Sequence, residues 1–300
     1  PYLPVRYYEI WNEPNIEFLE PPIGKARDEM YFELLKAAYE EIKKIDPSLK
    51  VVAMNTAGGA TKTGSALTPK ATFLKLGYMG FFRFIEGVHN LGGYKYYDIL
   101  AVHPYTQPLP PEVGGLVEGI KLLKKEMKRR GIDKPIWFTE VGFSLEYPRC
   151  PLCITQDQQA DYTLRLLGLA ARYGIQQVQI MYVEDIIYGP DGTSRQFGFY
   201  YNHQFRPVAL ATQLMINIIP EPQLLEVISD GNSQYNFYYA YKFKGRDNSE
   251  VIMAWTIGPP FKTTLDIGAS QVTLYKRDGR NKTLNLKEGK LNITITSSPI

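Results

Sequence analysis

The sequence has few cysteines, no long hydrophobic segment and little excess of either charge. Two cysteines in 300 residues are too few for a scaffold of several disulfides or for a four-thiolate zinc site. No apolar run approaches the roughly 18 residues of a membrane span. The 34 basic and 31 acidic residues leave a net charge of +3 and are interspersed along the chain. A globular protein is therefore expected, with neither nucleic acid nor a membrane as its partner.

Short apolar runs alternate with longer helical patterns over the first two thirds of the chain. This alternation predicts strand–helix units and a parallel sheet. The expected strands are residues 5–11, 50–55, 97–102, 135–139 and 177–183, and the expected helices are residues 28–45, 72–88, 113–130, 156–173 and 206–219. Such a sheet would leave residues 5–11 as a long apolar edge, which proteins usually avoid. Either the edge of an open sheet is covered in another way, or strands upstream of it are missing.

Beyond Pro220 the hydrophobic period changes from helical to two residues. The short alternating segments are separated by turn dipeptides such as Asp230-Gly231 and Asp278-Gly279. They cover residues 224–228, 235–243, 250–257, 263–267, 271–276, 282–286 and 290–295. We therefore expect an α/β domain over residues 1–221 and a small all-β sandwich over residues 222–300.

Several polar side chains stand where the predicted strands end. They are Asn12 and Glu13, Asn55, His103 and Tyr105, Glu140, and Glu184 and Asp185. Parallel α/β folds place their sites at the carboxyl ends of the strands, so these side chains are expected near one cleft. Glu13 and Glu140 end different strands. Two carboxyls aimed at one cleft are the equipment for glycoside hydrolysis, in which one protonates the leaving oxygen and the other attacks or activates water.

Two of these segments resemble signatures of the clan A glycoside hydrolases, which are (β/α)8 barrels. Residues 8–15 (YEIWNEPN) resemble the Asn-Glu-Pro signature that ends their fourth strand, and residues 136–142 (IWFTEVG) resemble the Thr-Glu-x-Gly end of their seventh strand. The spacing of two strand–helix units between them fits such a barrel. The resemblance is closest to families 39 and 5. It implies a TIM-type (β/α)8 barrel represented by about strands 4 to 8, with strands 1 to 3 upstream of Pro1 and a fragment at both ends.

The resemblance also implies roles for individual residues. Glu13 matches the acid/base and Glu140 matches the nucleophile of a retaining mechanism. Asn12 matches the residue that hydrogen-bonds the sugar 2-hydroxyl. His103 and Tyr105 match a His and a Tyr at the sixth strand, where the Tyr is commonly bonded to the nucleophile.

Further candidates for sugar contacts are aromatic or acidic. Tyr182 stands near the place where many clan members end the eighth strand with a Trp, which leaves the substrate preference open. Further aromatic rings could stack on a sugar face or belong to the core, namely those of Trp11, Tyr105, Phe143 and Tyr147. Glu184 and Asp185 could bind hydroxyls or cap the last loop.

The remaining polar features favour structural roles. Cys150 and Cys153 form a CxxC without a thioredoxin-type context, so a local loop disulfide or two free thiols is favoured over a redox site. His89 and His203 are predicted to be structural, and no metal site is expected. Glu9 is predicted to point into the barrel, where it would need a cationic partner.

The sequence thus predicts a retaining β-glycoside hydrolase that needs no cofactor and cleaves β-linked oligo- or polysaccharides of glucan, xylan or mannan type. The alternatives are an inactive carbohydrate-binding relative, an inert truncated fragment, or an open α/β hydrolase or transferase in which the acid pair is a coincidence. The absence of a Gly-x-Ser-x-Gly elbow and of a Gly-rich phosphate loop counts against the last. Sugar identity, endo or exo action, oligomeric state and compartment are left open.

Overall fold

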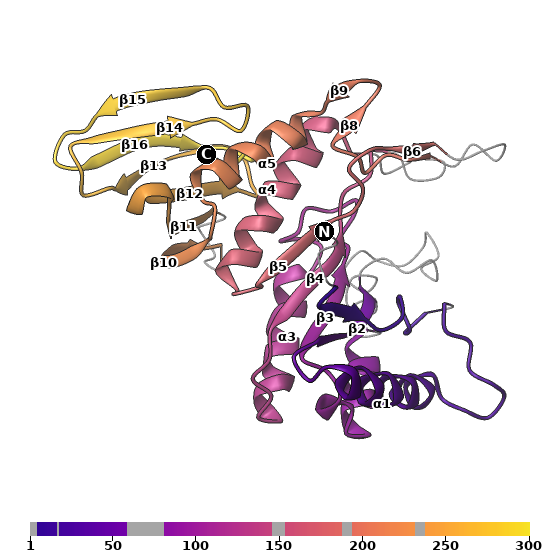
Figure 1. The fold of residues 1–300 in the computed structure, drawn as a ribbon. Coiled ribbons are helices and arrows are strands. Elements are labelled where there is room, and N and C mark those ends of the chain that lie inside the picture. The colour runs from indigo at the N-terminus through magenta and orange to yellow at the C-terminus, as the bar shows by residue number, and fades with distance from the viewer. Residues whose placement is uncertain (1–4, 17, 59–80, 146–153, 188–193, 232–237) are drawn as a thin grey trace. The chain divides into compact units, whose positions relative to one another are not determined.

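The computed structural model describes residues 5–16, 18–58, 81–145, 154–187, 194–231 and 238–300 (Figure 1). The chain forms two compact units. The first contains residues 1–142 and 174–181, and the second contains residues 143–173 and 182–300. The domain boundary expected between residues 221 and 222 stays a prediction.

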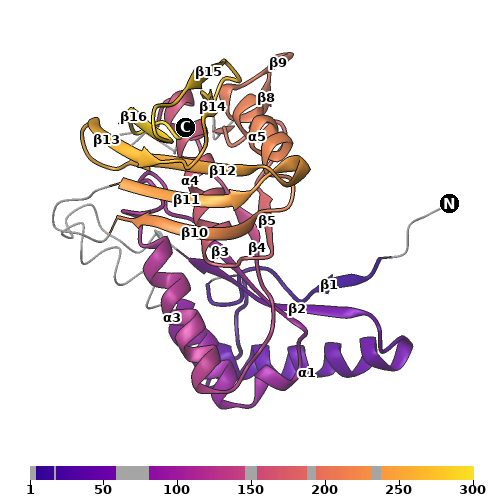
Figure 2. The same ribbon diagram turned by 90° about the vertical axis from the view of Figure 1, so that its left-hand side faces the viewer.

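The first unit is built on one parallel sheet of five strands in the order β1-β2-β3-β4-β5 (Figure 2). The strands are β1 (Tyr7–Glu9), β2 (Lys50–Gly58), β3 (Ile99–Pro104), β4 (Ile136–Val141) and β5 (Gln177–Ile180). Each strand pairs in parallel with the next one along the chain, as in Tyr8 opposite Val51 and Ala101 opposite Trp137. Sequential parallel strands joined by helices form a curled half-barrel, so the predicted α/β fold class is confirmed.

The central and edge strands of this sheet differ in burial. β2 and β3 are buried along nearly their whole length, as expected for the continuous apolar runs of parallel strands covered on both faces. All three residues of β1 are exposed because this strand lies at the sheet edge. The edge predicted over residues 5–11 is therefore a strand of only three residues. The ring of Tyr7 packs against Trp137 with 5.1 Å between centroids.

Helices join the strands of the first unit. Helix α1 (Arg27–Ile45) connects β1 to β2, and α3 (Leu116–Arg129) connects β3 to β4. Residues 81–90 are helical and precede the 3-10 turn η1 (Gly93–Lys95). Both α1 and α3 have acidic residues in the first turn and basic residues in the last, which complements the helix dipole. Among the described residues, no helix has the length and hydrophobicity to cross a bilayer.

The second unit combines two helices with small antiparallel sheets. Its longer elements are α4 (Gln156–Arg172), α5 (Pro207–Ile218), β10 (Gln223–Asp230), β11 (Tyr238–Lys244), β12 (Glu250–Thr256), β13 (Phe261–Asp266), β14 (Gln271–Tyr275), β15 (Asn281–Asn285) and β16 (Lys290–Ile295). Strands β10, β11 and β12 form one sheet, while β13 pairs with β16 and β14 with β15. Each predicted C-terminal strand is present. The short hairpins β6–β7 (Ile186–Ile187, Ser194–Arg195) and β8–β9 (Tyr200–Tyr201, Gln204–Phe205), and the turn η2 (Arg246–Asn248), were not expected.

Helix α4 packs against the β strands of its own unit through a glycine and an arginine. A Cβ atom on Gly168 would lie 3.0 Å from Met253 Sδ and 3.2 Å from the Trp255 ring, so a larger residue here would require these side chains to shift. The buried side chain of Arg165 donates hydrogen bonds to the carbonyls of Ser297 (3.0 Å) and Thr256 (3.4 Å). The strands after residue 222 therefore share one unit with α4 and α5.

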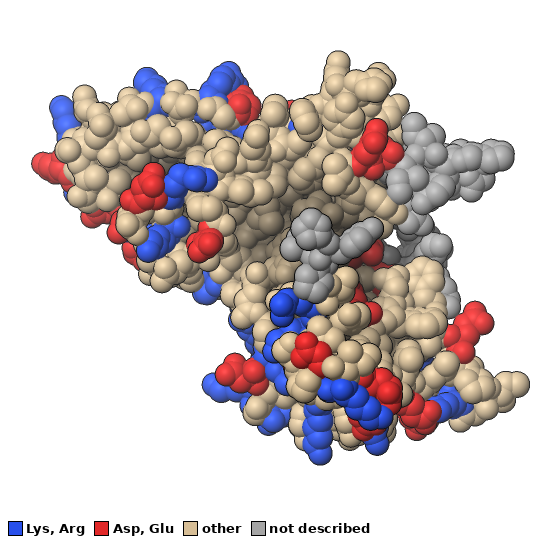
Figure 3. Space-filling model, viewed as in Figure 1, with Lys and Arg blue, Asp and Glu red and all other residues tan. Residues whose placement is uncertain are grey.

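Charged side chains are intermixed on the molecular face shown in Figure 3, where Lys and Arg alternate with Asp and Glu. No single-sign patch of the kind that binds polyanions stands out on this face. The picture agrees with the interspersed charges of the sequence.

Candidate active site

The carboxyl ends of β3 and β4 and the loop after β1 bring three of the predicted residues together. One carboxylate oxygen of Glu13, one ring nitrogen of His103 and one carboxylate oxygen of Glu140 all lie within 4.8 Å of one another. The hydroxyl of Tyr105 donates a hydrogen bond of 2.7 Å to Glu140 Oε1. Side chains distant in sequence thus meet at one end of the parallel sheet.

The backbone that carries Glu13 is fixed by Asn55 of β2. The Glu13 N–H donates to the Asn55 carbonyl at 3.1 Å. In return, the buried Asn55 side chain donates to the carbonyls of Ile10 (3.0 Å) and Trp11 (2.8 Å). The first residues after β1 are therefore held against β2 by a side-chain amide where regular strand pairing stops.

Asn15 fixes the far end of the same segment. Its side-chain amide donates to the carbonyl of Ala57 and accepts from the N–H of Ala57, both at 2.8 Å. Because Pro14 has no N–H with which to continue a ladder, the side chain of Asn15 takes over the pairing with β2. The segment YEIWNEPN thus contains its own anchors for Glu13.

Left-handed backbone conformations are concentrated around this segment. The residues with positive φ here are Trp11 (65°), Glu13 (45°), Met54 (81°) and Asn55 (45°). The buried Tyr31 of α1 braces them, because its hydroxyl donates to the Ile10 carbonyl (3.1 Å) and accepts from the Met54 N–H (2.9 Å). Strain of this kind persists only where the surroundings fix it, and it clusters at functional sites.

His103 is buried beside the acid pair and faces carboxylates on both sides of its ring. Its Nδ1 lies 3.1 Å from Glu13 Oε1 and 3.9 Å from Glu140 Oε2. Its Nε2 lies 3.2 Å from Thr139 Oγ1 and 3.8 Å from Glu9 Oε1. Burial alone would lower the pKa of His103, but the surrounding carboxylates outweigh it and raise the pKa to about 9. The carboxylates therefore favour the imidazolium form of the ring at neutral pH, and Glu9 is one of them, at 3.8 Å from Nε2.

Glu13, His103 and Glu140 are also residue types that can bind a metal ion, and their possible ligand atoms lie close together. A metal-binding imidazole must be neutral and offer a lone pair, so an ion would have to displace the ring proton of His103. With His103 protonated, its Nδ1 lies 3.1 Å from Glu13 Oε1 and 3.9 Å from Glu140 Oε2.

Two predicted sugar contacts lie next to Glu13 in the chain. Asn12 is exposed. The side chain of Trp11 is half exposed, and its indole N–H donates to the carbonyl of Phe18 at 2.9 Å, which fixes the orientation of the ring. Both side chains are accessible from solvent, and their sugar-binding roles stay predictions.

The candidates after β5 belong to the second unit. Tyr182 and Glu184 are accessible there, and their membership of the site stays a prediction. Asp185 has a structural role instead, because its fully buried carboxylate is paired with Arg206 and accepts the N–H of Gly198 at 2.8 Å.

Phe143 is buried and packs edge-on against Tyr162 with 5.5 Å between centroids, so it is a core residue. Tyr147, Cys150 and Cys153 lie outside the described residues. The stacking role of Tyr147 and the state of the two cysteines stay predictions.

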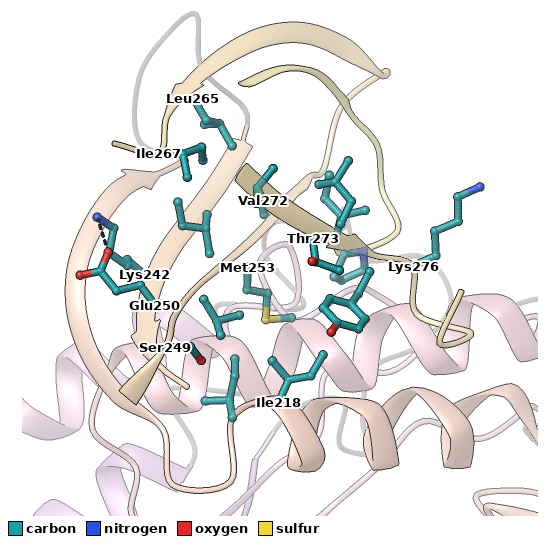
Figure 4. A pocket seen from close by; sticks show the side chains of 18 of the residues that line it. Ile218, Lys242, Ser249, Glu250, Met253, Leu265, Ile267, Val272, Thr273 and Lys276 are labelled. Atoms are coloured by element: carbon teal, nitrogen blue, oxygen red, sulfur yellow. Dashed lines mark ion pairs between the residues drawn. The ribbon is translucent and has the colours of Figure 1, made fainter. Parts of the chain in front are cut away.

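The second unit also contains an apolar cavity of about 580 Å³ (Figure 4). Aliphatic side chains of α5, β12 and β14 line much of it, including Ile218, Met253 and Val272. Among its described lining residues the one carboxylate is Glu250, which is paired with Lys242 at 3.3 Å. The described lining of this cavity therefore does not provide the pair of carboxyls that glycoside hydrolysis uses.

Sequence reasoning missed two residues that shape the site: Tyr31 was assigned no role, and Thr139 was treated only as part of the strand-end motif. Asn55 was expected near the cleft because it is a polar residue directly after the apolar run VVAM, but its role in holding the backbone of Glu13 was not predicted. No local pattern distinguishes Tyr31 from the other aromatics of α1, because its partners lie 21 and 23 residues away.

No protein-family model and no curated protein matches the sequence. Solved structures do match the fold. An arabinofuranosidase of glycoside hydrolase family 51 from Xanthomonas axonopodis pv. citri matches with a TM-score of 0.61 at 12% identity, over 99% of this chain and 65% of that chain. A family 51 α-L-arabinofuranosidase from Thermotoga petrophila matches with a TM-score of 0.58 at 13% identity, over 97% and 64%. A family 44 xyloglucanase from Paenibacillus polymyxa matches with a TM-score of 0.56 at 10% identity, over 98% and 65%.

The chain therefore spans slightly less than two thirds of these structures, with 64% to 65% of their length covered. At 10% to 13% identity the likeness establishes the fold alone. These neighbours are glycoside hydrolases of more than one family, and the clan A resemblance of residues 8–15 and 136–142 predicts the same architecture. This chain has the fold of the barrel-type glycoside hydrolases, with a curled parallel half-barrel followed by small antiparallel sheets.

Proposed function

We propose that this chain is a retaining β-glycoside hydrolase with Glu13 as acid/base and Glu140 as nucleophile. The observation that carries the proposal is the approach of one carboxylate oxygen from each residue to within 4.8 Å. Carboxyl groups about 5 to 5.5 Å apart favour retention, whereas about 6.5 to 9.5 Å leaves room for the water of an inverting enzyme. The short separation supports double displacement.

The reaction proceeds in two steps. In the first, a Glu140 oxygen bonds to the anomeric carbon while the glycosidic C–O bond breaks and Glu13 gives its proton to the leaving oxygen. In the second, Glu13 takes a proton from water, the water oxygen bonds to the same carbon, and Glu140 leaves as a carboxylate. Neither step requires a metal or an organic cofactor.

The neighbours of the acid pair support this division of roles. Tyr105 holds Oε1 of Glu140, so the carboxylate keeps one orientation and its second oxygen is free to attack. The accessible Asn12 lies next to Glu13 in the chain, where the resemblance implies a contact with the sugar 2-hydroxyl. The half-exposed Trp11 offers a ring for stacking.

The substrate we propose is a β-linked oligo- or polysaccharide of glucan, xylan or mannan type. The three neighbours named above do not share one substrate, because two are arabinofuranosidases and one is a xyloglucanase. A first test is therefore a panel of aryl β-D-glucoside, β-D-xyloside, β-D-mannoside and α-L-arabinofuranoside, with NMR of the first product to assign its configuration. Hydrolysis of a β-D-glycoside with retention is expected.

The roles of the two acids are separated by azide. Glu140→Ala is expected to lose turnover by a factor on the order of 1,000 or more, and added azide gives at most an inverted glycosyl azide. Glu13→Ala is expected to hydrolyse activated aryl glycosides slowly and to form a retained glycosyl azide, because its nucleophile is intact. Glu118→Ala, which removes an exposed carboxyl of α3, is the control. Wild-type rates in Glu140→Ala would refute the assignment.

The same panel tests the alternatives. An inactive carbohydrate-binding relative would bind oligosaccharides in calorimetry without hydrolysing any aryl glycoside. An inert fragment would do neither, although it holds both acids.

A further inference from the structure

Glu9 is the third carboxylate at His103 and has no role in the mechanism above. It comes from the edge strand β1, and its side chain is 38% exposed. Its Oε1 lies 3.8 Å from Nε2 of His103, on the side of the ring opposite the nitrogen that faces the acid pair. Among the described residues, the titratable groups that face this ring are Glu9 from β1, Glu13 from the loop after it, and Glu140 from β4.

The other ring nitrogen faces both catalytic carboxyls at once. Nδ1 lies 3.1 Å from Glu13 Oε1 and 3.9 Å from Glu140 Oε2. A single N–H at this position can therefore interact with either member of the acid pair without a movement of the ring.

We propose that Glu9 is a positioning residue that keeps a positively charged His103 between the two members of the acid pair. This inference rests on the proposed function and extends it to a residue outside the acid pair. The structural reason is that a buried imidazolium needs compensating groups at both nitrogens: at Nε2 the Thr139 hydroxyl accepts the hydrogen bond at 3.2 Å, and the Glu9 carboxylate provides the negative charge at 3.8 Å.

The double displacement explains why a fixed positive charge is useful here. Before the first step Glu140 is the anion of the pair, because Glu13 carries the proton. After that step Glu140 is an ester and Glu13 is the anion. One negative charge thus moves from one side of Nδ1 to the other and returns in the second step. His103 offsets the charge in both states, because its distances to the two carboxylates differ by less than 1 Å.

Glu9 matters most while Glu13 holds its proton. In that state the remaining anions near the ring are Glu9 at 3.8 Å and Glu140 at 3.9 Å. Without Glu9 the ring loses its proton at a lower pH, and a neutral His103 can accept the proton that Glu13 must deliver to the leaving group. Removal of Glu9 is therefore expected to shift the alkaline limb of activity to lower pH.

The first experiment measures the His103 ring directly and does not depend on catalysis. The chain has three histidines, so ¹⁵N-histidine labelling gives three ring systems, each assigned with its His→Asn variant. We expect His103 to titrate with a midpoint near its pKa of about 9 in the wild type and at least about one unit lower in Glu9→Gln. Glu118→Gln should leave the midpoint unchanged. The signals of His89, which is buried elsewhere in the same unit, show that each variant is folded.

The second experiment compares the pH profiles of kcat/KM. In Glu9→Gln the alkaline limb should move to lower pH by about the shift seen for the ring, and Glu9→Asp should recover part of it. An unchanged ring midpoint in Glu9→Gln would overturn the role of Glu9 and leave the hydrolase assignment intact. A shifted midpoint with an unchanged alkaline limb would also overturn it. A wild type that hydrolyses no glycoside would instead refute the proposed function, and the ring titration distinguishes that failure from the other two.

Discussion

His89 and His103 lie in the same unit, both are buried, and each has a ring nitrogen near a carboxylate, yet their protonation is opposite. Nδ1 of His89 is 3.8 Å from Glu126, and Nδ1 of His103 is 3.1 Å from Glu13. Burial lowers the pKa of His89 to about 4. For His103 the nearby carboxylates outweigh the effect of burial, and they raise its pKa to about 9.

The difference lies in what the carboxylates are already paired with. Glu126 accepts hydrogen bonds from Arg129 at 2.9 Å and from Arg130, so it adds little net negative charge at His89. In the part of the chain that the structure describes, no Lys or Arg is paired with Glu9, Glu13 or Glu140. A buried histidine is therefore charged when its carboxylate neighbours lack another cation, and the mere presence of a carboxylate does not decide it.

The largest effect is expected at the His89 cluster, on stability. Glu126→Gln removes the buried carboxylate that pairs with the largely buried Arg130, whereas the exposed Arg129 keeps Glu86 at 3.9 Å. The free energy of unfolding should fall by about 3 to 5 kcal/mol, measured by urea denaturation at pH 7. The matched control is Glu118→Gln, at an exposed position of the same helix α3. It should change the free energy of unfolding by less than about 0.5 kcal/mol. Equal effects of the two substitutions would show that Glu126 is not the organising charge of the cluster.

The fold was predictable from the sequence, but the opposite protonation of His89 and His103 mostly was not. In the half-barrel, continuous apolar runs predicted strands such as β2 and β3. In the C-terminal part of the chain, alternating apolar residues predicted strands such as β16. The ends of elements were less certain. Strand β2 continues to Gly58, past the polar Asn55 where the apolar run ends, because Asn55 is buried and hydrogen-bonded.

For the site, the sequence predicted that Glu13 and Glu140 approach each other, because each was placed at the end of an apolar strand and parallel strands end on the same side. It did not reveal that His103 is charged. That property depends on Glu9 and Glu13, which are 94 and 90 residues away, and on the absence of a paired Lys or Arg among the described residues. His89 has a similar local sequence context at the end of an apolar segment, so only the three-dimensional distribution of charge separates the two rings.

The pH dependence of stability should separate the two histidines next. The folded-state pKa of His103, about 9, is above the reference of 6.5, so its stabilisation is complete below about pH 6.5 and is lost as the pH rises to about 9. The folded-state pKa of His89, about 4, is below the reference, so stability is lost as the pH falls from about 6.5 to about 4. Across each of these pH ranges the free energy of unfolding should change by on the order of 3 kcal/mol.

Urea denaturation of the wild type, His103→Asn and His89→Asn from pH 4 to 9.5 tests this. His103→Asn should flatten the alkaline side of the stability curve only, and His89→Asn the acidic side only. If either variant flattened the opposite side, the assignment of the two charges would be reversed.

The smallest expected effect concerns the uncharged hydroxyl group that hydrogen-bonds each histidine ring. Thr139 Oγ1 lies 3.2 Å from Nε2 of His103, and the Tyr97 hydroxyl lies 3.0 Å from Nε2 of His89. A hydrogen bond to a charged group contributes roughly 1.5 to 3 kcal/mol, and one between neutral groups roughly 0.5 to 1.5 kcal/mol. At pH 7, Thr139→Val should therefore lower the free energy of unfolding by about 2 kcal/mol and Tyr97→Phe by about 1 kcal/mol, although the tyrosine contact is the shorter one.

Near pH 10, where His103 is neutral, the cost of Thr139→Val should decrease toward that of Tyr97→Phe. A cost of Thr139→Val that stays the same from pH 7 to pH 10 would mean that Thr139 does not bind a charged ring.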